Sequence, residues 1–391
     1  MTAYDFTTLQ ANWSFPTLVW FGAGRLADLP AGLDEIGGRA PLIITDRGLA
    51  VSDIVVQAKA AFESIGITPG LFSDVQPNPS VENVMAGLMA LRAGGHDCVI
   101  ALGGGSAMDA AKAVAMMAGQ NRPLMDFEDA GDNFRRVQPE GMVPVIAIPT
   151  TAGTGSEFGR SSVITDTDNH RKVIIFHPEM LPELVILDPQ VTVGLPARLT
   201  AATGMDALSH ALEALCAPGW HPMADGLALT VLKMIDASLV TAYLQPDNLG
   251  ARANMLAASA MACTALQKGL GAVHALAHPL GARYDAHHGM LNAVLMWHVL
   301  SFNLAEVGSQ MATLAHELRL DGDDPGAAVL DWLETLRARL DMPSTLRGMG
   351  IDVAEADIAA LVADALRDPC AGGNPVPLTT DGVEQILRAA F

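Results

Sequence analysis

The stretch Cys98-Val-Ile-Ala-Leu-Gly-Gly-Gly-Ser-Ala-Met-Asp-Ala-Ala-Lys-Ala-Val-Ala-Met-Met-Ala-Gly119 contains the clearest fold signal in this chain. Its apolar start predicts a buried strand over residues 98–102, and the glycines that follow predict a tight turn. The remainder, rich in Ala and Met, predicts a helix over residues 107–119. A strand, a glycine turn and a helix in succession are typical of an α/β domain whose parallel sheet is covered on both faces.

Neighbouring segments repeat this alternation. Apolar runs predict buried strands over residues 41–45, 143–148 and 184–187, and an amphipathic helix is predicted over residues 53–65. We therefore expect an α/β domain with a mostly parallel sheet over residues 1–195.

The pattern changes at about residue 196. Strand signals almost disappear, and long segments rich in Ala, Leu and Met predict helices over residues 199–217, 222–242, 249–266 and 291–306. We expect an all-helical domain over residues 196–391, with an active-site cleft between the two domains.

The composition excludes several classes of function. The 391 residues carry a formal net charge of −20, which argues against a surface that binds nucleic acid or an anionic membrane. No apolar run reaches the roughly 18 residues of a membrane span, and the N-terminal residues do not have the pattern of a secretory signal. The four cysteines form no CxxC pair, so we expect reduced thiols in a cytoplasmic protein.

The loop Gly103–Ser106 has the composition of an anion-binding turn. Glycines allow a close backbone approach, and the start of the following helix offers unpaired N–H groups and the positive end of its dipole. The loop is neither a GxGxxG fingerprint nor a Walker A loop, because no Gly-Lys-Ser/Thr sequence follows it. A pyrophosphate site and a turn without a ligand are both compatible with this sequence.

Three further features favour a nucleotide. The polar loop Pro149–Glu157 follows the strand predicted over residues 143–148, so its hydroxyl groups are expected at the same sheet edge. Lys172 is a candidate cation for a phosphate, and a solvated surface lysine is the alternative. Asp46 ends the strand predicted over residues 41–45. A carboxylate there accepts hydrogen bonds from an adenosine ribose and favours NAD over NADP, or it simply forms a turn.

Four residues of metal-ligand type fall in the helical half. Asp206 and His210 stand four apart, a spacing that places two side chains on one face of a helix. His274 and His288 stand fourteen apart in a stretch punctuated by glycines. One carboxylate and three imidazoles make a four-ligand set for a divalent metal, and a metal supplies the partners that such groups need when buried.

The chain resembles the group III, iron-dependent alcohol dehydrogenases over nearly its whole length. The motifs that carry the resemblance are Gly103–Ala113, Pro149–Glu157, Ile186–Pro189, the segment of Asp206 and His210, and His274–Asn292. The resemblance implies a dehydroquinate-synthase-like fold, with an N-terminal α/β dinucleotide-binding domain and an all-helical metal-binding domain.

The resemblance also implies roles for individual residues. Asp206, His210, His274 and His288 would bind the metal, expected to be Fe(II), although the ligand types also suit Zn. His278 would transfer protons. The residues implied to line the cofactor are Asp46, Asn78, Gly104, Gly105, Ser106, Asp109, Thr150, Thr151, Thr154 and Lys172.

One position departs from the family pattern. Where many members have Pro-His-Gly, this chain has His287-His288-Gly289. We assign the ligand to His288, because it preserves the spacing to His274 and the glycine that follows.

The implied activity is that of an NAD-linked alcohol dehydrogenase or aldehyde reductase, in which a metal-bound oxygen assists hydride transfer to or from the nicotinamide. One alternative is a sugar-phosphate cyclase or polyol-phosphate dehydrogenase of the same superfamily, which needs basic residues for a phosphate. Lys268 and Arg283 are almost the only cations near the ligands in the sequence. Maleylacetate-type reductases share the fold without requiring a metal. Another alternative is a non-catalytic, metal-binding structural protein.

The segment Ala11–Phe21 predicts an edge strand near the start of the chain. Such strands often pair across a dimer in this family, so a homodimer or larger homo-oligomer is expected. The expected substrate is a small alcohol or aldehyde, with no nucleic-acid or membrane partner.

Overall fold

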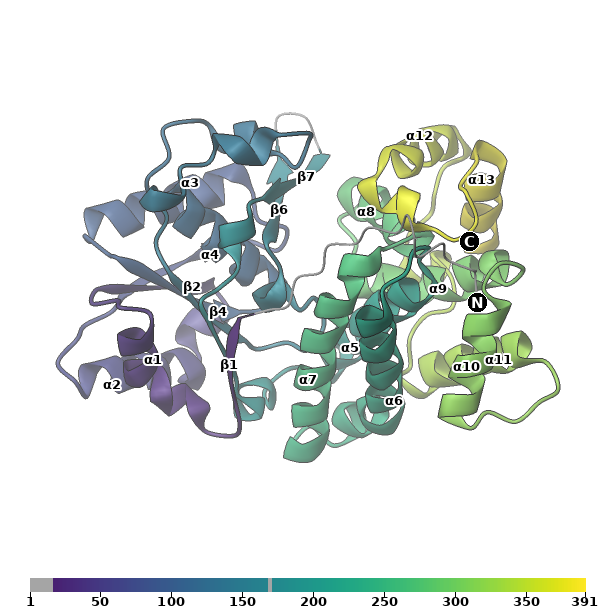
Figure 1. Ribbon diagram of the computed structural model, residues 1–391, viewed down its shortest axis with the longest axis horizontal. Coiled ribbons are helices and arrows are strands. Elements are labelled where there is room, and N and C mark those ends of the chain that lie inside the picture. Colours follow the sequence, from purple (N-terminus) through teal and green to yellow (C-terminus); the bar gives the residue numbers. More distant parts are fainter. Residues whose placement is uncertain (1–16, 168–170) are drawn as a thin grey trace, which may run out of the picture. The chain divides into compact units, whose positions relative to one another are not determined.

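A computed structural model of the chain describes residues 17–167 and 171–391. These residues form two compact units, which divide between Leu195 and Pro196. The first unit is an α/β unit and the second is helical (Figure 1).

The α/β unit contains a six-stranded parallel sheet with the order β1-β8-β5-β4-β2-β3. The strands are β1 (Leu18–Phe21), β2 (Pro41–Asp46), β3 (Gly70–Val75), β4 (Cys98–Gly103), β5 (Val145–Pro149) and β8 (Leu184–Leu187). The strands predicted over residues 41–45, 98–102, 143–148 and 184–187 are confirmed as β2, β4, β5 and β8. Every residue of β4, β5 and β8 is buried, which explains why these strands appear as unbroken apolar runs.

Helices cover both faces of this sheet (Figure 1). On one face lie α1 (Leu29–Glu35) and α2 (Asp53–Glu63), whose apolar side chains join those of the strands in a single core. On the other face lie α3 (Val81–Ala93) and α4 (Gly105–Met117). The helices predicted over residues 53–65 and 107–119 are therefore confirmed as α2 and α4.

The strand order fixes where a ligand can bind. From β2 the chain passes to β3 on one side, whereas from β4 it passes to β5 on the other side. In open α/β sheets, ligands bind outside the carboxyl ends of the strands at such a reversal. Asp46 is the last residue of β2, and the predicted anion-binding loop follows β4, so the fold places both at this point.

An antiparallel hairpin adds to the unit. It consists of β6 (Ser161–Asp166) and β7 (Arg171–Phe176), in which Thr165 pairs with Lys172. The sequence predictions missed this hairpin and the strand β3. β6 is buried only at alternate residues, and β3 carries Ser73 and Asp74, so neither presents a continuous apolar run.

The strand β1 forms one edge of the parallel sheet and pairs with β8. Residues 18–21 of the predicted edge strand are therefore confirmed, and residues 11–16 lie outside the described part of the chain. Leu18 and Phe21 of β1 are 45% and 48% exposed, respectively, so this edge presents apolar side chains.

The helical unit contains nine α-helices, and no strand occurs in residues 196–391. They are α5 (Ala197–Cys216), α6 (Pro222–Leu244), α7 (Leu249–Ala265), α8 (Ala272–Tyr284), α9 (His288–Asn303), α10 (Gly308–Leu318), α11 (Pro325–Arg339), α12 (Glu355–Arg367) and α13 (Thr380–Ala389). The helices predicted over residues 199–217, 222–242, 249–266 and 291–306 are confirmed as α5, α6, α7 and α9. Helix α5 packs against α6, α7 and α9, and 16 of its 20 residues are buried, so its polar side chains are held away from water.

Among the described residues, α6 alone is long and apolar enough to cross a membrane by length and composition. It packs against α5 and α7 and buries side chains such as Leu232 and Ile235.

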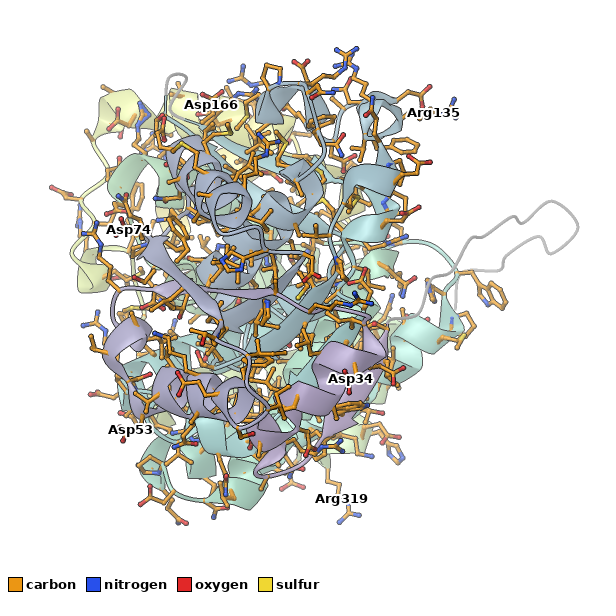
Figure 2. The ribbon with its side chains drawn as sticks, turned by 90° about the vertical axis from the view of Figure 1, so that its left-hand side faces the viewer. Asp34, Asp53, Asp74, Arg135, Asp166 and Arg319 are labelled. Carbon is orange, nitrogen blue, oxygen red and sulfur yellow. The ribbon has the colours of Figure 1, made fainter. Side chains whose placement is uncertain are left out.

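The excess of acidic residues lies partly on the outside of the α/β unit. Asp34, Asp53 and Asp74, on α1, α2 and β3, are exposed at its surface (Figure 2). Their charges are solvated there and need no buried partner.

Candidate metal centre

The structure brings the four predicted ligands together from three helices. Asp206 and His210 lie one turn apart on α5, His274 lies on α8, and His288 is the first residue of α9. The Asp206 Oδ1 atom lies 3.8 Å from His210 Nε2 and 3.5 Å from His288 Nε2. The His274 ring stacks on the His210 ring, with centroids 4.8 Å apart, and its centroid lies 5.1 Å from that of His288.

The environment of these side chains fits a divalent metal. Asp206, His210 and His274 offer ligand atoms within 4.8 Å of one another, and all three residues are buried. Burial lowers the pKa of His274 well below its ordinary value, which keeps the imidazole neutral, as metal ligation requires. Among the described residues, His210 and His288 pair with the buried Asp206 carboxylate, and no lysine or arginine does. A bound metal would supply the positive charge that balances this carboxylate.

Glu213 holds His274 in place. Its Oε2 atom lies 2.6 Å from His274 Nδ1, and its Oε1 atom accepts a hydrogen bond from the Val273 N–H at 2.7 Å. The geometry assigns the Nδ1 proton of His274 to this contact and leaves Nε2 for a metal, the arrangement in which carboxylates orient histidine ligands. Burial raises the pKa of Glu213 to about 7.

Asn292 ties the carboxylate to the third helix. Its Nδ2 atom donates to Asp206 Oδ1 at 2.8 Å and lies 3.1 Å from His288 Nε2. It stands one turn after His288 on α9, so both side chains lie on the same face of that helix.

His287 is placed differently from His288. It is the exposed residue that precedes α9, where its backbone carbonyl accepts hydrogen bonds from Met290 and Leu291. His288, whose side chain is 27% exposed, is the one that reaches Asp206.

His278 lies one turn after His274 on α8 and borders the four ligands. Its ring stacks on that of His288, with centroids 5.5 Å apart and an interplanar angle of 13°. Its Nδ1 atom lies 2.8 Å from Asp368 Oδ2, and its side chain is 22% exposed. This histidine therefore has one nitrogen held by a carboxylate and a route to solvent that the buried His274 lacks.

Sequence reasoning missed Glu213, Asn292 and Asp368 as parts of this site. Glu213 stands seven residues after Asp206, on the same helical face, so its spacing contained a usable signal. Asn292 likewise follows His288 by four residues. Asp368 follows α12, 90 residues beyond His278, and no sequence spacing links the two.

In the α/β unit, the two predicted nucleotide loops lie against each other. A Cβ atom added to Gly105 would lie 2.8 Å from the Thr154 methyl carbon, and one added to Gly104 would lie 3.3 Å from that of Thr151. Ser106 lies in the first turn of α4, and the Thr150 N–H donates to the carbonyl of Gly103. The start of α4 therefore borders threonine side chains from the loop after β5.

Three further candidate cofactor residues lie on strands of this unit or shortly after one. Asp46 ends β2, Asn78 follows β3, and Lys172 lies on β7. The Asp46 Oδ1 atom accepts hydrogen bonds from the backbone N–H groups of Gly48 and Leu49, so the residue does form the predicted turn. Lys172 Nζ donates to Asn78 Oδ1 at 2.8 Å. Asn78 has a φ of 56°, a left-handed conformation that asparagine tolerates better than most residues.

Asp109 and Lys112 hold the second loop from within. The Asp109 carboxylate accepts hydrogen bonds from the Ser156 hydroxyl at 2.5 Å and from the Val163 N–H at 3.0 Å. Lys112, which is 1% exposed, donates to the backbone carbonyls of Ser156, Gly159 and Ser161. The structure thus gives Asp109 a positioning contact, and it adds Lys112, which sequence reasoning did not assign.

Glu157, in the same loop, gives the stability of this unit a pH dependence. Burial raises its pKa from 4.5 to about 7, the nearby Lys112 opposes the shift, and its Oε1 atom accepts no hydrogen bond from the described residues. The folded state favours the protonated form of Glu157. The contribution of this acid to folding stability is therefore complete below pH 4.5 and is lost as the pH rises through about 7.

We expect Glu157→Gln to remove this dependence. Between pH 5 and pH 8 the wild-type protein should lose about 2.5 kcal/mol of stability that the variant retains. Thermal unfolding midpoints at the two pH values measure the difference, with the exposed Glu63→Gln as the control that keeps the wild-type dependence. Equal pH dependence in Glu157→Gln and wild type would show that Glu157 is already ionised in the folded protein.

Comparisons with known proteins identify the family. Residues 16–189 match the family model described as iron-containing alcohol dehydrogenase, and residues 200–391 match the C-terminal model of the same family. The chain belongs to the iron-containing alcohol dehydrogenase family. The resemblance, the fold and the reaction class predicted from the sequence are confirmed: the enzyme is a metal-dependent oxidoreductase of alcohols and aldehydes.

Three relatives illustrate the similarity. The enzyme is 38% identical to 4-hydroxybutyrate dehydrogenase of Cupriavidus necator, over 95% of this chain and 97% of that protein. It is 34% identical to the NAD-dependent methanol dehydrogenase of Bacillus methanolicus, over 98% and 100%. A crystal structure of 1,3-propanediol oxidoreductase superposes with a TM-score of 0.93 and 32% identity, covering 98% of this chain and 100% of that one.

Proposed function

We propose that the enzyme transfers hydride between NAD(H) and a small, uncharged alcohol or aldehyde, with a metal held by Asp206, His210, His274 and His288. The observation that carries the proposal is the convergence of these side chains, from α5, α8 and α9, around Asp206 Oδ1. Fe(II) is the proposed metal and Zn the second choice, since imidazole and carboxylate ligands suit both. When bound, the metal polarises the substrate oxygen and lowers the pKa of the alcohol.

The protein groups around this site orient and exchange protons. Glu213 fixes the His274 ring so that Nε2 stays available, and Asn292 holds the Asp206 carboxylate. His278 carries the hydroxyl proton between the site and solvent, because it combines partial exposure with a carboxylate partner at Nδ1.

The cofactor is proposed to bind at the strand-order reversal of the α/β unit. The N-terminus of α4 offers N–H groups to the pyrophosphate, and the threonines beside Gly104 and Gly105 offer hydroxyl groups. The proposed cofactor residues are Asp46, Asn78, Gly104, Gly105, Ser106, Asp109, Thr150, Thr151, Thr154 and Lys172. Asp46 uses Oδ1 for its turn, and Oδ2 remains for a ribose hydroxyl, which favours NAD over NADP.

Charge pairing in the helical unit favours an uncharged substrate. Lys268 Nζ lies 2.5 Å from Asp225 Oδ1, and Arg283 Nη2 lies 3.4 Å from Asp357 Oδ1. Both cations that the sequence placed near the ligands are therefore neutralised by carboxylates, which disfavours a sugar-phosphate or polyol-phosphate substrate.

The proposal also covers the oligomeric state and the cellular compartment of the enzyme. We infer a homodimer or larger oligomer from the exposed apolar side chains on the edge strand β1, and a cytoplasmic enzyme from its four cysteines, which form no disulfide. The domain limits 1–195 and 196–391 are likewise proposed.

A screen of substrates tests the function. Short alcohols, diols, aldehydes and the hydroxy acid 4-hydroxybutyrate would be assayed with NAD(H) and NADP(H), before and after metal removal and with Fe(II) or Zn restored. We expect metal-dependent turnover, faster with NAD(H) and with neutral substrates. Turnover of a phosphorylated substrate without net oxidation would instead support the cyclase alternative.

We expect Asp368→Asn to reduce kcat by roughly 10- to 100-fold, because an amide replaces the carboxylate that holds and orients the His278 ring through Nδ1. Metal content and NADH affinity should stay unchanged, and the pH profile of kcat should change shape. The control is Asp364→Asn on the exposed face of α12, where the carboxylate pairs with Arg367. A wild-type pH profile in Asp368→Asn would show that the pair has only a structural role.

A further inference from the structure

A second cluster of metal-ligand side chains borders the proposed metal centre. His278, Asp368 and Cys370 offer a nitrogen, an oxygen and a sulfur atom, all within 4.8 Å of one another. Asp368 and Cys370 lie two residues apart at the start of a short 3-10 helix, Pro369–Gly373, which packs against α8. The Cys370 N–H donates to Asp368 Oδ1 at 2.8 Å, and the Cys370 thiol contacts the same carboxylate.

This cluster differs from the four-ligand set in chemistry and in access. The four-ligand set contains no sulfur, and Asp206, His210 and His274 are buried. The second cluster contains a thiol, and all three of its residues are partly exposed. Sulfur, imidazole and carboxylate together form a ligand set that Zn²⁺ takes readily and that soft ions such as Cd²⁺ also favour.

We propose that His278, Asp368 and Cys370 form a separate inhibitory site for thiophilic divalent cations. Each residue supplies one ligand, and solvent completes the coordination. The Cys370 thiol gives up its proton to solvent when the metal–sulfur bond forms.

Occupation of this site stops proton transfer without removing the metal of the four-ligand set. The ion takes the place of the hydrogen bond that now joins His278 Nδ1 to Asp368 Oδ2, so the histidine can no longer pass a proton through that nitrogen. This consequence rests on the proposed role of His278, whereas the binding of the ion does not.

Titration with Cd²⁺ tests the proposal on enzyme that already holds one equivalent of its own metal. We expect a second equivalent to bind, a thiolate-to-metal absorption band to develop in proportion, and turnover to fall at least about tenfold while the first metal is retained. Cys370→Ala should keep the basal turnover, lose the band and weaken inhibition by about tenfold or more. Cys263→Ser, a control at a buried cysteine of α7, should behave like wild type.

The possible outcomes separate the new site from the proposed function. If Cys370→Ala bound the second equivalent as tightly as wild type, or if Cd²⁺ displaced the first metal without forming the band, the new site would be excluded and the proposed function would stand. If Cd²⁺ bound through Cys370 and turnover stayed unchanged, inhibition would be excluded, together with the role of His278.

Discussion

His274→Ala is expected to lose bound metal and alcohol oxidation together while NADH binding persists. His274 lies in the buried group with Asp206 and His210, and Glu213 already holds its Nδ1 atom. Its removal takes away the histidine that contacts the buried Glu213 carboxylate and leaves three of the four metal ligands. The several kcal/mol that a metal contributes to the transition state correspond to a loss in kcat of about a thousandfold or more.

The neighbouring histidines supply a matched control for this experiment. His288→Ala should behave like His274→Ala, whereas His287→Ala should retain metal and turnover, because His287 is exposed ahead of α9. Metal analysis, NADH fluorescence and steady-state turnover would be measured on the same samples. Metal loss in His287→Ala with retention in His288→Ala would show that the ligand assignment is wrong by one residue.

Gly289→Ala is expected to damage the same site without removing any ligand. A Cβ atom at position 289 would overlap the Ala202 carbonyl oxygen and lie 2.8 Å from its carbonyl carbon, with Asp206 Cβ at 3.3 Å. These are mainly backbone atoms of α5, so α9 must move away from α5, and His288 moves with it. Such overpacking costs about 1–3 kcal/mol, and separation of His288 from Asp206 should weaken metal binding by at least about tenfold.

Gly226→Ala is the control for this substitution. Gly226 lies in α6, and an added Cβ atom would meet no atom within 4 Å. Alanine there should leave metal binding unchanged and stabilise the helix by up to about 1 kcal/mol. Metal affinity and thermal unfolding of both variants measure the effect. Wild-type metal affinity in Gly289→Ala would mean that the contact between α5 and α9 does not set the ligand geometry.

The sequence predicts those parts of the fold that depend on local pattern. The buried strands of the parallel sheet are continuous apolar runs, and the two glycine-containing loops follow them directly. The strand β3 and the hairpin of β6 and β7 were missed because their stability depends on pairing with other segments, and their exposed positions dilute the apolar signal.

The candidate site likewise contains some residues that the local sequence predicts and others that it does not. Asp206, His210, His274 and His288 are recognisable because their spacing within two short segments is informative. The partners that orient such residues were harder to find, since Asp368 reaches His278 only through the tertiary packing of the C-terminal helices. Lys112 was missed because an isolated lysine in a helix predicts a solvated side chain, whereas here three backbone carbonyls satisfy it.

The most direct test of the central claim is to follow deuterium from the carbinol carbon of a deuterated alcohol to the nicotinamide ring of NAD. We expect transfer by the metal-loaded enzyme, no transfer above background after the metal is removed, and recovery when Fe(II) or Zn is restored. Deuterium transfer at the full rate by metal-free protein that still binds NADH would show that hydride transfer does not need the metal.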